Sequence, residues 1–256
     1  MPYARTILFL SLVFLIGPFA IIILAGFSAG ETLAFPPQGL SLRWYIMVFT
    51  IKDFQDAFVL SILIGLVATV FALILGVPVA YALSRYDVPG GEVIKTLVTA
   101  PIIVPGIIVG LSLLRYFVFQ FDVPITLTLF IAHTALLVPY CVRVVSASLE
   151  NLRADIEEAA VLLGMSRLPV FFVIVLPNIR SALMVAAILS FITSFNQVPV
   201  SIFLSGPGVS MLPIQMLSYL EYNYDPSIAA LSALLAGGSI LLVFFAERVL
   251  GLSRYM

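Results

Sequence analysis

Long apolar runs separated by short polar segments make up most of this sequence. A helix needs roughly 20 consecutive apolar residues to cross the hydrocarbon core of a bilayer, and each run is long enough. The first run also exceeds the apolar core of a signal peptide, so we expect it to remain as a membrane helix. The pattern predicts an all-α polytopic membrane protein, a single transmembrane domain (1–256) with six transmembrane helices at about 7–27, 57–84, 96–119, 124–148, 180–204 and 227–247.

The third run carries residues that disturb a regular helix. Pro101 and Pro105 each lack a backbone donor, which predicts a kink. Gly106 and Gly110 lie four residues apart on one face and would allow another segment to approach closely.

The distribution of basic residues predicts the orientation in the membrane. With both termini in the cytoplasm, nine Lys and Arg residues lie at or near the inner side and three at the outer side. This orientation makes the segment at about 150–178 cytoplasmic and the segments at about 31–56 and 205–226 outer loops. The inner set is Arg5, Arg85, Lys95, Arg143, Arg153, Arg167, Arg180, Arg248 and Arg254, and the outer set is Arg43, Lys52 and Arg115.

Aromatic and acidic residues gather in the two outer loops. Apolar residues recur at near-helical spacing around Trp44 and Tyr45, which predicts an interfacial helix with both rings at headgroup level. Candidate contacts for a partner protein or a gate, with anchoring at the interface as the alternative, are Trp44, Tyr45, Tyr219, Glu221, Tyr222 and Asp225.

Composition excludes several classes of function. Apolar residues make up 62% of the chain and charged residues only 10%, against roughly 25% in a soluble domain. A net charge of −1 argues against nucleic-acid binding. The single cysteine, Cys141, cannot form an intrachain disulfide and is interpreted as a packing residue. No glycine-lysine phosphate-binding motif and no catalytic or metal-ligating set are present, so we expect a non-enzymatic chain without a cofactor of its own.

Few polar side chains lie within the predicted spans. None of the spans has Asp, Glu, Lys or Arg at its centre, which argues against a proton relay. His133 is interpreted as an interhelical hydrogen-bond partner, with a titrating role as the alternative. The run Ser194-Phe195-Asn196-Gln197 in the fifth span supplies the candidate solute contacts, although the same groups would equally hydrogen-bond neighbouring helices.

The longest polar interruption, at about 150–178, contains a short predicted helix. Asp155 and Glu158 have the spacing of a helix start, with Asp155 as the cap and Glu158 reaching back. Ala159 and Leu163, like Ala160 and Gly164, fall four apart and so share a side of that helix. A small-residue face outside the bilayer suits the groove of another protein, and a helix lying on the lipid surface is the alternative.

The same segment carries a long motif. It reads Glu-Ala-Ala, three residues, Gly, nine residues, Ile-x-Leu-Pro, from Glu158 to Pro177. This pattern resembles the signature loop of the membrane subunits of binding-protein-dependent ABC importers. The resemblance implies a type I ABC importer fold in which this loop forms a coupling helix that docks on the ATPase. The residues implied in coupling are Glu157, Glu158, Ala159, Ala160, Leu163, Gly164, Ile174, Leu176 and Pro177.

The resemblance also implies partners and a location. The chain would pair with a second, similar permease in a bacterial inner membrane, together with two ATPase subunits and a periplasmic solute-binding protein. ATP and Mg²⁺ would be bound by the ATPase subunits, and the outer loops would meet the binding protein or form a gate.

Two further runs resemble the spermidine/putrescine-type permeases, in particular their C-type subunit. They are Phe35 to Tyr45 and Val200 to Pro207. Polyamine-type members often carry acidic residues where this sequence has Asn196 and Gln197. The resemblance to this subgroup implies import of a polyamine or a related amine or amino compound by ATP-driven alternating access. The alternatives are a different solute, such as an opine-like compound or an aminophosphonate, and an ATPase-independent secondary transporter.

Overall fold

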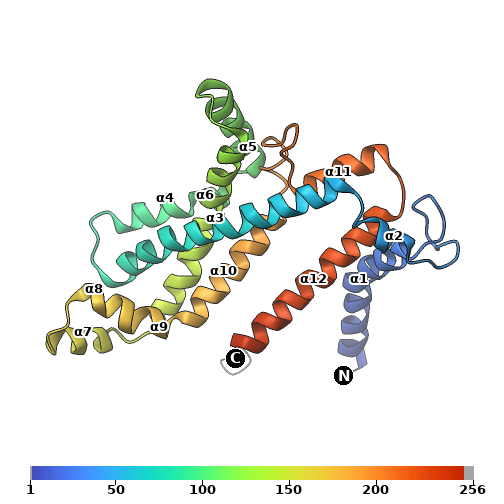
Figure 1. Cartoon of the computed structure of the whole chain (residues 1–256). Coiled ribbons are helices and arrows are strands. Elements are labelled where there is room, and N and C mark those ends of the chain that lie inside the picture. Colours follow the sequence, from blue (N-terminus) through green and yellow to red (C-terminus); the bar gives the residue numbers. More distant parts are fainter. Residues whose placement is uncertain (1, 251–256) are drawn as a thin grey trace. The chain divides into compact units, whose positions relative to one another are not determined.

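The computed structural model describes residues 2–250 and is built from helices throughout (Figure 1). Within these residues there is no β-strand, only two isolated bridges, Ser28–Leu40 and Gly206–Val209. The helices are α1 (Pro2–Gly26), α2 (Arg43–Met47), α3 (Lys52–Arg85), α4 (Gly91–Ile103), α5 (Gly106–Leu113), the π-helix η1 (Leu114–Gln120), α6 (Ile125–Asn151), α7 (Ala154–Leu162), α8 (Arg167–Val170), the π-helix η2 (Phe171–Val175), α9 (Leu176–Asn178), α10 (Arg180–Phe195), α11 (Leu212–Tyr222) and α12 (Ser227–Leu250).

Four helices in the described part are long and apolar enough to cross a membrane: Tyr3–Gly26, Lys52–Arg85, Ile125–Asn151 and Ser227–Phe244. Two further candidates are bent pairs. Gly91–Ile103 and Gly106–Gln120 meet at 92°, and Arg167–Asn178 and Arg180–Phe195 meet at 73°. The number of spans is therefore four, or up to six if each bent pair crosses once. The predicted all-α, polytopic class is confirmed.

The third predicted span is broken at the prolines. α4 continues through Pro101 and ends at Ile103, and Val104 is extended with φ −73° and ψ 130°. A residue that precedes proline avoids the helical region because of the proline ring, so Pro105 explains the position of the break. The predicted kink is therefore present, and the helices on its two sides meet at 92°.

The fifth predicted span also departs from the sequence pattern. α10 ends at Phe195, well before residue 204, and residues 199–204 form turns. The end is explained by Pro199, which cannot continue a helix and holds Val198 out of the helical region. Val200 and Leu204 are fully buried. Protein therefore covers much of this non-helical segment, as non-helical backbone in an apolar environment requires.

The chain divides into two compact units, each of which is described by itself. Unit 1 contains the chain up to residue 59 together with 214–245, and unit 2 contains 60–213 together with the C-terminal end from residue 246. Arg254, one of the basic residues used to predict orientation, lies outside the described residues.

Small residues form the inward face of α3 in unit 2. Gly65 is so close to α10 that a Cβ there would lie 3.0 Å from the Phe191 ring, and one on Gly76 would lie 2.8 Å from Cys141 Sγ of α6. The opposite face carries large apolar residues that are about half exposed. Small residues allow close helix packing in lipid, where burial of large apolar groups offers no gain. The inward residues, all buried, are Ser61, Gly65, Ala68, Ala72, Gly76 and Ala80.

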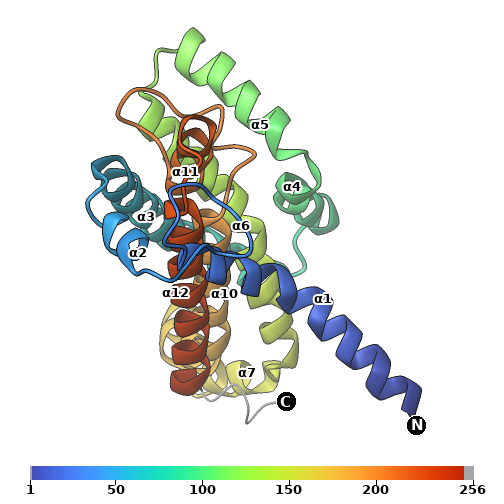
Figure 2. The same ribbon diagram turned by 90° about the vertical axis from the view of Figure 1, so that its right-hand side faces the viewer.

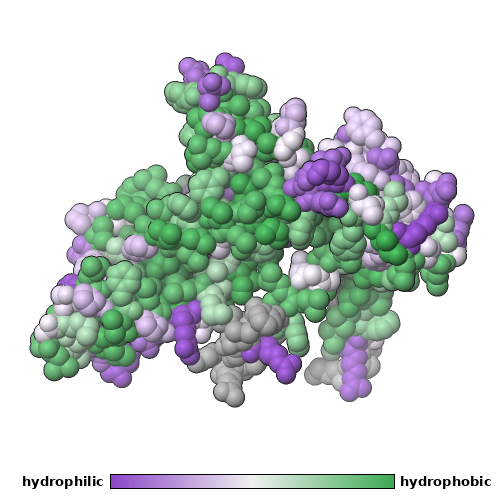
Figure 3. All heavy atoms as spheres, in the orientation of Figure 1, coloured by the Kyte–Doolittle hydropathy of each residue, from purple (hydrophilic) through white to green (hydrophobic). Residues whose placement is uncertain are grey.

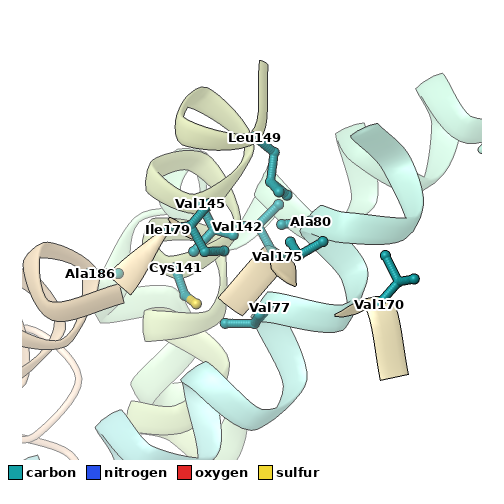
Figure 4. Close-up of a cluster of buried hydrophobic side chains, with 10 residues drawn as sticks. All are labelled: Val77, Ala80, Cys141, Val142, Val145, Leu149, Val170, Val175, Ile179 and Ala186. Carbon is teal, nitrogen blue, oxygen red and sulfur yellow. The ribbon is translucent and has the colours of Figure 1, made fainter. Parts of the chain in front are cut away.

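A core of aliphatic side chains lies where α3, α6 and the segment around η2 meet (Figure 4). Val145, Leu149 and Val175 within it are fully buried. The segment from α7 to α9 lies at one end of unit 2, and α5 lies at the other end (Figures 1 and 2). Apolar residues cover most of the visible surface of α3 and α4, as Figure 3 shows.

Unit 1 joins α1, α2, α11 and α12. A Cβ on Gly26 of α1 would lie 3.0 Å from the backbone of Ala230 in α12, so these helices touch there. The Tyr45 hydroxyl of α2 donates to Ile23 O at 3.3 Å. The short helix predicted around Trp44 and Tyr45 is confirmed.

Candidate coupling loop and solute pathway

The helix α7 begins differently from the prediction. Its first residue is Ala154 and the preceding Arg153 is extended, so Asp155 lies inside the first turn and does not cap it. Asp155 instead accepts from Arg153 Nε at 3.1 Å, and this hydrogen bond lowers the pKa of the Asp155 carboxyl. The predicted capping role of Asp155 is wrong because the helix begins at Ala154, two residues before the position that Asp155 would cap.

α7 ends in a Schellman motif around Gly164. The Gly164 N–H donates to Val161 O at 2.9 Å and the Met165 N–H donates to Ala160 O at 3.1 Å. Gly164 has φ +95°, a conformation that glycine adopts without strain. A Cβ there would meet nothing within 4 Å, so the space beside Gly164 is open. The predicted helix end at this glycine is confirmed.

α7 has an inward and an outward face. Glu157 is buried, and Ala160 and Val161, three and four residues later, are half-buried. Glu158 and Ala159 are exposed, and Leu162 and Leu163 are 88% and 90% exposed. Two adjacent leucines exposed beside an open glycine make an apolar surface that has no cover within the described chain.

Glu157 belongs to the inward face, although the sequence grouped it with the coupling residues. Its Oε1 accepts from Arg85 Nε at 2.7 Å and its Oε2 accepts from the Tyr81 hydroxyl at 2.8 Å. The Glu157 and Arg85 side chains are only 10% and 12% exposed. Glu157 therefore contacts α3, and its charge is not available to a partner protein.

The last motif residues shape the return of the chain. Ile174 and Leu176 are half-buried against the core, and Pro177 is exposed in α9. Pro177 has no N–H to donate to the carbonyl of Val173, and the backbone before it is a π-helix. The 73° bend between α9 and α10 follows. Ile174, Leu176 and Pro177 therefore contribute more to how the loop folds than to its exposed surface.

The four candidate pathway residues do not share one environment. Ser194 is buried and its hydroxyl lies 2.7 Å from His133 Nδ1 of α6. The Phe195 ring lies beside Phe191. Asn196 is exposed at the end of α10, where its Nδ2 donates to Ile192 O at 3.1 Å, and Gln197 is half-buried. Ser194 thus makes a hydrogen bond between α10 and α6, and Asn196 is the most exposed polar group of the four.

A buried polar network surrounds His133, and the sequence predicted only part of it. Its Nε2 lies 3.1 Å from the hydroxyl of Ser201, and that hydroxyl donates to Met211 Sδ at 3.3 Å. His133 is therefore an interhelical hydrogen-bond partner, as predicted. The roles of Ser201 and of the Tyr81–Arg85 pair were missed. The four-residue spacing of Tyr81 and Arg85 at the end of a span was the signal available for the latter.

The outer-loop candidates in unit 1 also divide into two groups. Trp44 is 6% exposed and donates from Nε1 to Gly30 O at 3.2 Å. Tyr219 donates its hydroxyl to Asp225 Oδ2 at 2.9 Å, and partial burial together with this hydrogen bond raises the pKa of Tyr219. Asp225 also accepts from the Ser227 N–H at 2.9 Å, at the start of α12. These residues hold the unit together, whereas Glu221 and Tyr222 are exposed.

No group of three or more His, Cys, Asp or Glu residues within 2–250 is arranged to hold a metal ion.

The helices and the exposed loop together define an all-α integral membrane protein of the transport class. The chain belongs to the family of binding-protein-dependent transport system inner membrane components, whose model matches residues 68–252. It is a permease subunit of an ABC importer, a non-catalytic transport component of the inner membrane. The spermidine/putrescine-type resemblance seen in the sequence is confirmed among its relatives.

The relatives have printed names with different solutes. The putrescine transport system permease protein PotI of Escherichia coli is 34% identical over 96% of this chain and 89% of its own length. The sulfate transport system permease protein CysT of Salmonella typhimurium is 30% identical over 83% of this chain and 85% of its own length. The spermidine/putrescine transport system permease protein PotC of Haemophilus influenzae is 29% identical over 83% and 82%.

A solved structure shares the fold. The crystal structure of a bacterial ABC transporter involved in the import of the acidic polysaccharide alginate matches with a TM-score of 0.72. The match covers 97% of this chain and 94% of that chain at 19% identity.

Proposed function

We propose that the chain imports a polyamine or a related small amine, and that α7 is the coupling helix that docks into a partner ATPase. The observation that carries the docking proposal is the outward face of α7. Leu162 and Leu163 are almost fully exposed beside Gly164, where the backbone is open to close approach. A contiguous exposed apolar surface of this kind is typical of a site where another protein binds.

The proposed docking surface is smaller than the motif. It consists of Glu158, Ala159, Leu163 and Gly164, with Leu162 added. Ala160, Ile174 and Leu176 pack against the core beneath the loop, exposed Pro177 lies where the chain turns back, and Glu157 positions α7.

The proposed arrangement in the membrane follows from the basic residues. We assign six spans by counting each bent pair as one crossing, with both termini and α7 in the cytoplasm. A second permease and two ATPase subunits that bind ATP and Mg²⁺ would complete the inner part. A periplasmic binding protein would meet the outer loops, with exposed Glu221 and Tyr222 as its first candidate contacts.

A cationic solute is supported by two observations. The relative with 34% identity over 96% of the chain is named as a putrescine permease. Asn196 lies at the carboxyl end of α10, where the helix dipole leaves a partial negative charge of roughly half an electron. Asn196 Nδ2 donates one of its two hydrogens to Ile192 O, and the side-chain carbonyl oxygen is an acceptor suited to ammonium.

A second candidate is a solute that is not a polyamine. The sulfate permease relative is 30% identical, and Asn196 and Gln197 carry no charge. A neutral, hydrogen-bonding site is also compatible with an opine-like compound or an aminophosphonate.

The docking proposal is tested with Gly164→Glu and the matched control Gly90→Glu. Gly90 also has a positive φ, 73°, and open space at its Cβ, and it lies in a connection on the same proposed side of the membrane. Both substitutions therefore impose the same backbone strain of about 1–2 kcal/mol. We expect Gly164→Glu to insert normally and to lose the co-purifying ATPase, and Gly90→Glu to keep it. Normal ATPase recovery with Gly164→Glu would overturn the docking role of α7.

The solute is tested by uptake of labelled putrescine, spermidine and sulfate in native cells with and without this gene. Loss of putrescine or spermidine uptake alone supports the amine proposal. Loss of sulfate uptake alone replaces it with the second candidate.

A further inference from the structure

We infer that the ion pair between Glu157 and Arg85 is the positioning contact through which movement of α7 reaches the membrane helix α3. The inference rests on the proposed docking of α7 on an ATPase, and it concerns how the docked helix moves its own subunit. It assigns the transmission of this movement to Glu157 and Arg85, which lie outside the proposed docking surface.

Glu157 is the only residue of α7 that is buried, so it is the fixed point of that helix. Ala160 and Val161 contact the core but are half-exposed. Apolar contact is non-directional, so it does not by itself fix the orientation of α7. A charge-assisted hydrogen bond has a preferred length and direction, so it transmits a displacement.

Both oxygens of the Glu157 carboxylate are held by the same helix. Arg85 Nε and the Tyr81 hydroxyl, at 2.7 and 2.8 Å, come from positions one turn apart on α3. A carboxylate fixed at two points cannot turn about its own axis without breaking one bond. A rotation or translation of α7 is therefore applied directly to the end of α3.

Arg85 holds a second segment as well. Its Nη2 donates to the carbonyl of Leu152 at 2.8 Å, and Leu152 is the residue that ends α6. The same guanidinium thus ties α7 and the end of α6 to α3. The centroid of the Tyr81 ring lies 4.8 Å from that of the Phe171 ring in η2. The far end of the loop thus also contacts α3.

Close packing of side chains does not hold α7 against α3 beside the Glu157–Arg85 ion pair. A cavity of about 350 Å³ lies beside the ion pair and is lined by Tyr81, Arg85, Ala154, Glu157, Glu158, Val161, Leu162, Arg167 and Val170. Since α7 borders open space there, the hydrogen bonds of Glu157 determine its position more than side-chain interdigitation does.

The test uses the importer assembled with its ATPase and reconstituted in lipid vesicles. Its binding protein is loaded with whichever of putrescine, spermidine and sulfate the uptake comparison identifies. Two quantities are measured for each variant: the amount of co-purifying ATPase, and the stimulation of ATP hydrolysis by the loaded binding protein. Glu157→Gln preserves the side-chain shape and removes the charge. We expect normal ATPase recovery with stimulation and uptake reduced about ten-fold, the equilibrium change expected when a hydrogen bond to a charged group is lost.

Tyr81→Phe is the milder variant, because it removes one hydroxyl and leaves the ion pair in place. We expect a loss of stimulation of a few fold. Glu157→Gln combined with Arg85→Gln should be no worse than the more impaired of the two single variants, because the two residues act as a unit. Lys52→Gln is the control, since it breaks the Lys52–Asp56 pair on the same helix α3, whose side chains are 79% and 66% exposed. That variant should match the wild type.

Two results would overturn the inference. One is full stimulation in Glu157→Gln. The other is a lower yield of assembled complex whose remaining molecules are fully stimulated, which would make the ion pair a folding contact only. Failure of the docking proposal is distinguished from both, because it appears as ATPase retained by Gly164→Glu.

Discussion

The Nδ1 atom of His133 lies 2.7 Å from the hydroxyl oxygen of Ser194, and this contact joins α6 to the last turn of α10. His133 Nε2 lies 3.1 Å from the Ser201 hydroxyl, and that hydroxyl donates to Met211 Sδ. One imidazole thereby connects a helix, the buried turns after it and the segment that leads into α11.

His133→Leu should destabilise the assembled protein by about 1–3 kcal/mol, because it leaves buried hydroxyls without their partner. Thermal unfolding in detergent measures the change. His133→Gln, which keeps a donor and an acceptor, should recover part of the loss. Equal stability of the wild type and His133→Leu would show that the network is not needed for folding.

Thr134→Val should be neutral or stabilising. The Thr134 hydroxyl is buried and has no hydrogen-bond partner among residues 2–250, so it incurs a desolvation cost that a methyl group does not. Thr128 on the same helix is the matched control, since its hydroxyl donates to Pro124 O at 3.2 Å. Thr128→Val should cost about 1 kcal/mol in the same unfolding assay. A larger loss of stability in Thr134→Val than in Thr128→Val would contradict the assignment of the Thr134 hydroxyl as unpaired among residues 2–250.

Leu163→Ser should leave the stability of the chain unchanged and weaken ATPase binding about 10- to 150-fold, the equivalent of about 1.5–3 kcal/mol for one buried leucine. The reason is that Leu163 is 90% exposed in this subunit. Leu149→Ala is the contrast, because Leu149 is fully buried and its truncation should cost about 2–5 kcal/mol of stability. A titration of purified ATPase and an unfolding curve separate the two effects.

Gly76→Ala should reduce the yield of folded protein, since the new methyl group would lie 2.8 Å from Cys141 Sγ and 2.9 Å from its Cβ. Gly237→Ala in α12 meets nothing within 4 Å and replaces a poor helix former. It should therefore stabilise the chain by up to about 1 kcal/mol. If Gly76→Ala and Gly237→Ala have the same effect on folded yield and stability, the close approach of α3 and α6 is not the reason for glycine at position 76.

Asn196→Asp tests the nature of the solute. If the solute is a polyamine, a carboxylate at the carboxyl end of α10 adds attraction, and the KM for uptake should fall several-fold. If the solute is sulfate, the same substitution should abolish uptake. No change in KM for either solute would remove Asn196 from the pathway.

The sequence predicted those parts of the fold that depend on local chemistry. Apolar length gave the long helices α1, α3, α6 and α12, and Pro105 marked the break before α5. Gly164 was identified as a helix end, and its Schellman hydrogen bonds agree.

The misses concern long-range geometry. The sequence shows the charges of Arg85 and Glu157, but they are 72 residues apart and nothing local indicates that Glu157 turns inward. The end of α10 was missed because a buried irregular segment such as Val200–Leu204 has the same apolar composition as a helix. Pro199 was the available signal, and it was outweighed by the length of the apolar run.

The small-residue face of α3 reverses the usual relation between side-chain size and mutational tolerance. In a water-soluble protein, large buried residues accept few replacements and small surface residues accept many. On α3 the constrained positions are Gly65 and Gly76, where an added Cβ crowds a neighbouring helix, and Ala68 and Ala72, which are fully buried. Bulky Leu66, Val70 and Ile74 face outward and need only stay apolar. Relatives can therefore diverge widely in sequence along this helix while the spacing of its smallest residues preserves the helix contacts.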